Sequence, residues 1–206
     1  MANHCYNYVT LNGDAEILEE ISKKLRTYDK FNYITNFFDY VLNKITFPPD
    51  LVDNNDDLDN NGVRDYNYYG TKWWDMHVNI EGIEDDVLTI SGDTAWAPPL
   101  QFIEELCIQY DLCATCEYEE PGMDIAGIAT YSENGHEDHK QMTYREYEYS
   151  NNYDAWFENA LYCLEELLEE ENSQEEIHNY CKELLHYCTK GDIDELLIEL
   201  KELKDE

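Results

Sequence analysis

A segment rich in aspartate and asparagine has the residue types and the spacing of a calcium-binding loop. Its oxygen-bearing positions are Asp57, Asp59, Asn61, Val63 and Asp65. They match positions 1, 3, 5, 7 and 9 of an EF-hand loop, where position 7 contributes a backbone carbonyl. Position 12 of the loop is a tyrosine instead of the usual bidentate glutamate, so one further ligand would have to come from elsewhere in the chain. The segment predicts a calcium site, and the alternative is an acidic turn shaped by its Asn-Gly pair.

Two cysteines and two histidines form a second candidate set of metal ligands. Cys113 and Cys116 lie in a segment of strand-like composition, and His136 and His139 follow further along the chain. Residues three apart on a strand point to opposite faces, and two histidines this close do not have the usual spacing of a zinc site. We therefore expect no zinc, and calcium is the one cofactor that the sequence leaves open.

The sequence contains no pattern typical of an active site. Its carboxylates are too numerous for one pair to be distinctive as an acid–base dyad. No serine lies in the setting of a nucleophile elbow, and no glycine-rich loop follows a strand to hold phosphates. We expect a protein that is not an enzyme, and an enzyme remains the less favoured alternative.

Acidic residues dominate the composition. The 206 residues include 47 acidic and 13 basic side chains, which gives a formal net charge of −34. This charge excludes direct binding of nucleic acid, which requires a basic surface. The distribution is uneven, because residues 1–45 are nearly balanced while residues 146–206 carry 19 acidic and four basic side chains. Simple solvation and adaptation to high salt are the alternatives to a functional role for this charge.

The sequence also indicates a compartment. No apolar run is long enough to cross a membrane, and the first residues lack the regions of a secretory signal. The seven cysteines are an odd number without the spacing of a disulfide framework. Reduced thiols in the cytoplasm are the simplest interpretation.

The hydrophobic pattern predicts an α+β sandwich of the ferredoxin-like type. A strand at residues 5–11 precedes a helix with Asp14 as its N-cap, and two further strands meet at an acidic turn. A helix follows Pro98 and Pro99, and strand-like composition returns after it. The resulting order is βαββαβ. We predict a domain over residues 1–145, with an aromatic and acidic insertion at about residues 28–75.

Residues 146–206 are predicted to form an acidic helical extension. Its helices are expected at about residues 153–171, 174–189 and 193–204, each with one apolar stripe. Gly191 is interpreted as the end of a helix and Asp192 as the N-cap of the next.

Several short motifs together carry a family resemblance. They are Asn3-His-Cys-Tyr-Asn, Pro48-Pro-Asp-Leu after an aromatic stretch, Tyr69-Gly-Thr-Lys-Trp, Val78-Asn-Ile and Asp93-Thr-Ala-Trp-Ala-Pro-Pro. Over about residues 1–135 the chain resembles the YubB ferredoxin-like family of phage and plasmid accessory proteins. The resemblance implies the ferredoxin-like fold and a bacterial host, and it implies no chemistry. It also implies that Trp73 and Trp96 are packing or scaffold positions, and that the acidic helices lie outside the family's pattern.

Charge and resemblance together predict a DNA mimic. Carboxylates one helical turn apart form a ridge that could occupy the basic groove of a nucleic-acid-binding protein. The predicted acidic face consists of Glu165, Glu166, Glu169, Glu170, Glu171, Glu175, Glu176, Asp85 and Asp86. We expect the partner to be a host defence protein, either a CRISPR effector or a restriction enzyme. The alternatives are a calcium-binding module and a general protein-interaction module, and the chain could act as a monomer or a homodimer.

Nearby aromatic side chains are candidate anchors for such an interface. They are Tyr144, Tyr147, Tyr149, Tyr153, Trp156 and Tyr162. For each of them, packing between the helix and the rest of the protein is the alternative.

Overall fold

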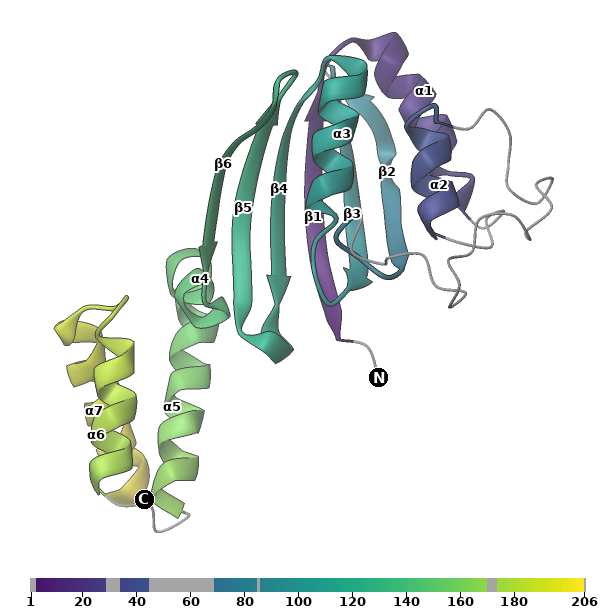
Figure 1. Ribbon diagram of the computed structural model, residues 1–206. Helices are drawn as coiled ribbons and strands as arrows, with labels where there is room; N and C mark the ends of the chain where they lie inside the picture. Colours follow the sequence, from purple (N-terminus) through teal and green to yellow (C-terminus); the bar gives the residue numbers. More distant parts are fainter. Residues whose placement is uncertain (1–2, 29–33, 45–68, 85, 170–173, 206) are drawn as a thin grey trace. The chain divides into compact units, whose positions relative to one another are not determined.

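The computed structural model describes residues 3–28, 34–44, 69–84, 86–169 and 174–205 (Figure 1). The chain divides into two compact units, residues 1–141 and residues 142–206. Each unit contains a hydrophobic cluster of its own.

The first unit is built on a six-stranded sheet with the strand order β2-β3-β1-β4-β5-β6. The strands are β1 (His4–Asn12), β2 (Trp74–Glu84), β3 (Val87–Ala95), β4 (Cys113–Glu120), β5 (Ile125–Ser132) and β6 (Gly135–Met142). The helix α1 (Ala15–Leu25) follows β1, and α3 (Leu100–Tyr110) connects β3 to β4. Strand β1 pairs antiparallel with both β3 and β4. This arrangement confirms the predicted ferredoxin-like βαββαβ fold.

The first helix begins at the predicted N-cap. The side chain of Asp14 accepts hydrogen bonds from the backbone N–H groups of Glu16 and Ile17, at 2.9 and 3.3 Å. Lys23 and Lys24 stand in the last turn, where a positive charge interacts favourably with the helix dipole. Local sequence therefore fixes both ends of α1, and its apolar face packs on the sheet.

Gly92 allows β2 and β3 to approach each other closely. Its φ angle is 140°, and a Cβ atom at this position would stand 2.3 Å from the backbone oxygen of Asp75. No side chain fits there without moving the backbone of β2. The glycine therefore maintains the register in which Asp75 lies opposite Asp93.

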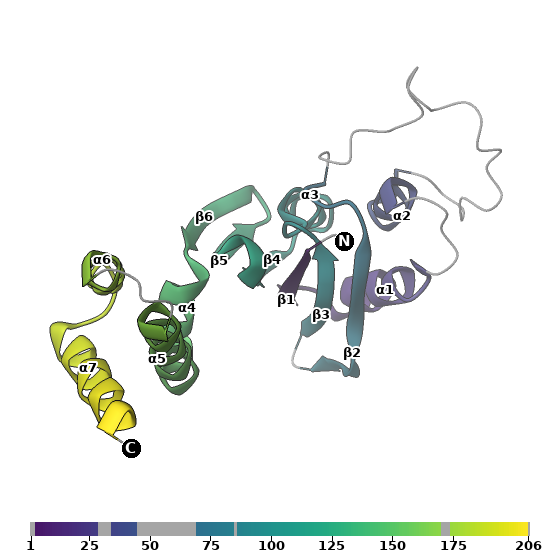
Figure 2. The same cartoon turned by 90° about the horizontal axis from the view of Figure 1, so that it is seen from below.

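The three α-helices described in the first unit share one face of the sheet (Figure 2). The third, α2 (Ile34–Val41), comes from the predicted insertion. Its Phe37 and Phe38 are fully buried, and the ring of Phe38 stacks on Phe102 of α3 with centroids 4.2 Å apart. Trp74 of β2 completes this aromatic group, with its ring 5.5 Å from that of Phe38. The aromatic part of the insertion therefore belongs to the core.

The sheet extends beyond the predicted order of elements. A short 3-10 helix, η3 (Pro121–Met123), turns the chain from β4 into β5, and β6 follows after a second turn. Strand β6, the last in the sheet order, was not predicted from the sequence. Most of its side chains are exposed, which removes the alternating pattern that identifies a strand.

The second unit consists of helices packed around Trp156. The helices are α4 (Tyr144–Asn151), α5 (Tyr153–Glu169), α6 (Gln174–Leu184) and α7 (Lys190–Asp205). Its core is formed by Trp156, Ala160, Leu164, Leu184, Cys188, Ile193, Leu196 and Leu200. The sequence analysis did not predict α4, which begins at Thr143, whose hydroxyl accepts the N–H of Glu146 at 3.1 Å.

The start of α7 differs from the prediction. Thr189, not Asp192, occupies the capping position, and its hydroxyl accepts the N–H of Asp192 at 3.4 Å. In return the carboxylate of Asp192 accepts the N–H of Thr189 at 2.8 Å. This reciprocal pair is a capping box one turn earlier than expected. Gly191 consequently lies in the first turn of α7 and does not terminate a helix.

Candidate interaction surfaces

The face of the sheet opposite the helices exposes two tyrosines. Side chains alternate along β1, so that Cys5, Val9 and Leu11 enter the core while Tyr6 and Tyr8 point the other way. Tyr6 is 44% exposed and Tyr8 is 41% exposed. This surface, formed by the second side of β1, β3 and β4, is called the open face below.

Carboxylates flank these tyrosines on the neighbouring strands. In the sheet register, Tyr6 lies between Asp93 of β3 and Glu119 of β4. Tyr8 lies between Ser91 and Glu117 in the next row. Residues directly opposite each other in a sheet share a face and stand about 5 Å apart. The open face therefore presents aromatic rings with negative charge beside them.

The N-terminal end of β1 adds a histidine to the open face. The ring of His4 meets Trp73 edge to face with centroids 5.0 Å apart, and its Nδ1 lies 3.1 Å from an Oδ atom of Asp93. The sequence analysis missed His4, Tyr6 and Tyr8 as surface residues. The signal was present, because these residues alternate with Cys5 and Val9 in a strand whose other side is apolar.

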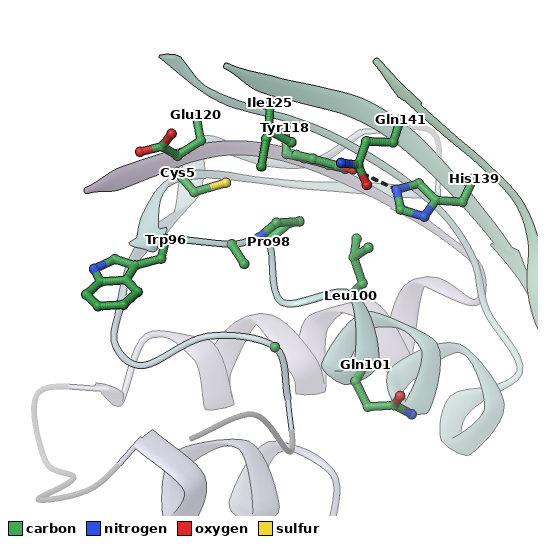
Figure 3. A pocket seen from close by; sticks show the side chains of 12 residues that line it. Cys5, Trp96, Pro98, Leu100, Gln101, Tyr118, Glu120, Ile125, His139 and Gln141 are labelled. Atoms are coloured by element: carbon green, nitrogen blue, oxygen red, sulfur yellow. Dashed lines mark hydrogen bonds between the residues drawn. The ribbon is translucent and has the colours of Figure 1, made fainter. Parts of the chain in front are cut away.

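A hollow of about 380 Å³ lies on the other side of the sheet, at the loop that leads into α3 (Figure 3). Its lining includes Trp96, Pro98, Leu100, Tyr118, Ile125 and His139. Trp96 stands at one end and His139 at the other, with Tyr118 directed toward His139. The hydroxyl of Tyr118 and Nε2 of His139 are 2.7 Å apart, so these two polar groups satisfy each other.

Two side chains of this hollow, the phenol of Tyr118 and the thiol of Cys5, remain protonated at neutral pH. Burial raises the pKa of Tyr118 to about 12. Burial also raises the pKa of the Cys5 thiol to about 12, although a hydrogen bond with Thr94 opposes this effect. Neither group is therefore an activated nucleophile in this state. The size of the hollow suits a small molecule.

One exposed stripe of α5 carries a regular series of carboxylates. Asp154, Glu158, Tyr162 and Glu166 follow at intervals of four residues, and all four are exposed. The hydroxyl of Tyr162 donates to Glu166 at 2.7 Å. Successive members are about 6 Å apart along the helix axis. This series is called the α5 ridge below.

The predicted acidic face coincides only in part with the α5 ridge. Glu166 belongs to it, Glu165 is half-buried beside it, and Glu176 is exposed on α6. Glu169 ends α5 and Glu175 lies in α6, and their side chains are outside the described structure. Asp85, Glu170 and Glu171 lie outside the described residues altogether.

Asp86 from the predicted set belongs to the first unit. It is exposed in the turn between β2 and β3 with a φ angle of 62°, and its carbonyl accepts the N–H of Gly13 at 3.2 Å. The sequence analysis in turn did not single out Asp154 and Glu158. The four-residue interval between them, and from Glu158 through Tyr162 to Glu166, was the signal that would have identified the ridge.

The two predicted metal sets have different outcomes. The calcium ligands Asp57, Asp59, Asn61, Val63 and Asp65 all lie outside the described residues, so the calcium site stays a prediction. Cys113 is exposed and Cys116 is buried, as expected for opposite faces of β4. Within the described parts of the chain, no three His, Cys, Asp or Glu side chains are grouped as metal ligands.

The candidate aromatic anchors are mostly engaged within the second unit. Trp156 is buried in its core, where the Tyr149 ring meets it at 4.9 Å. The hydroxyls of Tyr149 and Tyr153 both donate to Asp192 at 3.0 Å. Tyr162, at 58% exposed, remains available as an anchor because its ring lies at the surface of α5.

Fold and surfaces together define an acidic protein of the ferredoxin-like class. The family model described as the ferredoxin-like domain in Api92-like protein matches residues 69–177, which is more than half of the chain. The chain therefore belongs to the family of Api92-like proteins. It is also similar to the crystal structure of Api92 from Yersinia pseudotuberculosis, with 11% identity, a TM-score of 0.41, and coverage of 69% of this chain and 98% of that one. No curated protein matches the chain.

The family match corrects the resemblance inferred from short motifs. The chain is an Api92-like protein, and the assignment to the YubB family was wrong. Three of the motifs used for it, at Tyr69, Val78 and Asp93, lie within the matched segment, where they form the approach to β2, part of β2 and the exit from β3. The match also continues through α4 and α5 to residue 177. The acidic helix α5 is therefore part of the family's domain, not an addition outside it.

Among the described residues, no helix is both long enough and apolar enough to cross a membrane.

Proposed function

We propose that this protein is a non-catalytic DNA mimic that binds a basic, nucleic-acid-binding protein and keeps nucleic acid out of its groove. The α5 ridge is the observation that carries the proposal. It displays three exposed carboxylates on α5, those of Asp154, Glu158 and Glu166, in a four-residue series whose remaining member is Tyr162. No lysine or arginine stands three or four residues from Asp154, Glu158 or Glu166, so that no helical neighbour neutralises them.

The overall charge supports the same function. Like charges at neighbouring helical positions destabilise a helix, and a net charge of −34 destabilises the folded protein as a whole. A basic groove that normally holds DNA attracts such a surface over several ångströms and orients its approach. The repulsion within the free protein is relieved when the partner's positive charges come close.

The partner is defined by its chemistry. The expectation of a phage or plasmid protein rested on the resemblance to the YubB family, which the family match removes. What remains is a basic groove that binds nucleic acid. Restriction enzymes and CRISPR effectors have such grooves, and an inhibitor of either would be anti-restriction or anti-CRISPR in effect.

Displacement of DNA tests the proposal. A restriction endonuclease and a CRISPR effector are each loaded with a fluorescent DNA duplex, and the full-length protein is titrated in while anisotropy is measured. We expect displacement at low salt that weakens as sodium chloride is raised, because ion pairs between exposed groups are screened. The combined change Asp154→Asn, Glu158→Gln and Glu166→Gln should weaken displacement about tenfold.

A matched variant controls for the number of charges removed. Asp111→Asn, Asp124→Asn and Glu133→Gln also remove three exposed carboxylates, all from turns of the first unit. Asparagine tolerates the left-handed backbone of positions 111 and 124. We expect this variant to displace DNA nearly as well as the natural protein. If both variants lose activity equally, or if the natural protein displaces DNA from neither target, the proposal of mimicry through the α5 ridge is wrong.

A further inference from the structure

We infer that the open face of the sheet binds an arginine-bearing segment of the partner protein. This inference rests on the proposed function, because it specifies which chemistry of a basic partner the first unit recognises. It concerns a surface on β1, β3 and β4 of the first unit, whereas the α5 ridge belongs to the second unit.

The charges of the open face favour a cationic ligand. Asp93 and Glu119 stand on either side of Tyr6, each on the strand next to it. Glu117 stands beside Tyr8 in the following row. Neighbouring strands are about 4.8 Å apart, so a cation placed over the Tyr6 ring is within reach of both flanking carboxylates.

The tyrosines favour arginine over lysine. A guanidinium group is planar, stacks on an aromatic face and pairs with a carboxylate through two parallel hydrogen bonds. Tyr6 and Tyr8 are two residues apart on one strand, and their Cα atoms are therefore separated by about 6.8 Å. Successive outward side chains of an extended arginine-bearing peptide have the same spacing, so each can meet one tyrosine.

The same arrangement argues against nucleic acid as the occupant. Aromatic residues on a sheet can stack on bases, but such platforms also need basic side chains along the phosphate backbone. The residues opposite these tyrosines on β3 and β4 are Asp93, Ser91, Glu119 and Glu117, and none of them is lysine or arginine. The histidine of this face, His4, contacts Asp93. The carboxylates of this face repel phosphate. The open face therefore has the aromatic rings of a nucleic-acid-binding sheet, but the charge around them is negative instead of positive.

Peptide binding tests the inference. The full-length protein is titrated with a peptide of nine arginines and with a peptide of nine lysines, and the affinity of each is measured by calorimetry. We expect the arginine peptide to bind more tightly. The double change Tyr6→Leu and Tyr8→Leu should lower its affinity about fivefold while changing that of the lysine peptide less than twofold.

Two further variants separate recognition from folding. Tyr6→Phe with Tyr8→Phe keeps both rings and should retain the preference for arginine. Glu117→Gln with Glu119→Gln should weaken both peptides, because it removes charge without removing rings. Circular dichroism checks that each variant keeps its secondary structure. If the arginine preference survives the leucine variant, or if no preference exists, the inference is wrong.

If RNA or a second copy of the chain binds the open face instead, the leucine variant distinguishes these cases. Binding of a nine-nucleotide single-stranded RNA that the leucine variant abolishes would place nucleic acid on the open face. A dimer in sedimentation that the leucine variant converts to a monomer would place a second copy of the chain there. Either result overturns the inference.

The inference and the proposed function fail separately. If the leucine variant has no effect but the α5 ridge variant loses DNA displacement, the function stands and the open face is not the contact. If the natural protein displaces DNA from no target yet prefers the arginine peptide, the open face binds cations but mimicry is wrong.

Discussion

At the scale of single residues, the tryptophans show how position decides a side chain's role. Trp74 is 3% exposed and lies among Phe37, Phe38 and Phe102, whereas Trp96 is 53% exposed. Trp96 also has a φ angle of 67°, a conformation that is unusual for a bulky residue. The motif resemblance implied that Trp73 and Trp96 are packing or scaffold positions. Trp96 is not a packing position, because its exposed ring stands at the end of the hollow, whereas Trp74 enters the core.

This difference predicts opposite sensitivities to substitution. Trp74→Ala should lower the free energy of unfolding by about 3–5 kcal/mol, because it leaves a cavity in the aromatic core. Trp96→Gly should change it by less than about 1 kcal/mol, because the relief of the left-handed backbone offsets the greater freedom of glycine in the unfolded chain. Urea unfolding of the full chain measures both changes. Equal losses in the two variants would contradict this assignment of core and surface.

At the scale of elements, periodicity decided what could be predicted from the sequence. The strand β1 and the helices α1 and α3 were predicted because each has one apolar side that packs on the core. Strand β6 and helix α4 were missed because they bury little: the one described buried residue of α4 is Glu148, and β6 buries only Gly135. An element without an apolar side leaves no periodic signal. Pairing and capping, which depend on the rest of the chain, define such elements instead.

The candidate surfaces could be predicted only in part, because they depend on helix boundaries and strand register. The excess of acidic side chains was evident from composition, but which of them share a face depended on helix boundaries. The predicted ridge began at Glu165, whereas the exposed stripe runs from Asp154 to Glu166. The open face required the register of β1 with β3 and β4, which pairs Tyr6 with Asp93 and Glu119. Residues so far apart in the sequence give no local indication that they are neighbours.

The capping box of α7 makes the helical unit sensitive to acid. The hydrogen bonds that Asp192 accepts, first of all from the Thr189 hydroxyl, hold the pKa of its carboxyl below the ordinary value. Tyr149 and Tyr153 also donate to this carboxylate. A carboxyl group whose pKa is lower in the folded state than in the unfolded state stabilises the folded protein at pH values above the unfolded-state pKa, which is about 3.9 for aspartate. This stabilisation is lost as the pH falls through the folded-state pKa.

Asp192→Asn should therefore destabilise the second unit at neutral pH and much less in acid. The expected result is a difference in stability between the natural protein and the variant that is constant above about pH 5 and shrinks below about pH 4. The NMR signal of Trp156, the tryptophan of residues 142–206, reports unfolding of this unit. Glu195→Gln, in the next turn of α7, serves as a control whose effect should vary less with pH. A pH-independent difference for Asp192→Asn would show that its hydrogen bonds do not depend on ionisation.

At the scale of the whole molecule, charge opposes folding. A net charge of −34 on 206 residues repels itself in the compact state more than in the unfolded chain. Two ion pairs of the described residues, Lys23 with Glu19 and Lys24 with Glu20, lie in the nearly balanced first part of the chain, and Lys44 of that part pairs with Glu105. In the rest of the chain, the repulsion between acidic side chains is screened by dissolved cations.

Salt should therefore stabilise the free protein. We expect the melting temperature to rise by several degrees between about 0.02 M and about 0.5 M sodium chloride, because the screening length falls from roughly 20 Å to less than 5 Å. The variant Asp154→Asn, Glu158→Gln and Glu166→Gln should show a smaller rise. Differential scanning calorimetry measures the effect, and an equal osmolality of sucrose controls for influences other than charge. A melting temperature that falls with salt would show that attractive pairs outweigh repulsion.

The alternation of β4 has a practical consequence for observing this molecule. Of the seven cysteines, only Cys113 is exposed. Burial raises the pKa of Cys5 and of Cys107 to about 12, which keeps both thiols inert toward maleimides. Cys113 points to the same side of β4 as Glu117 and Glu119, yet it lies opposite Asn12, away from the tyrosine rows. A fluorescent dye attached to Cys113 in a brief reaction would report the binding of a ligand to the open face. The labelling would not change any of the side chains proposed to contact that ligand.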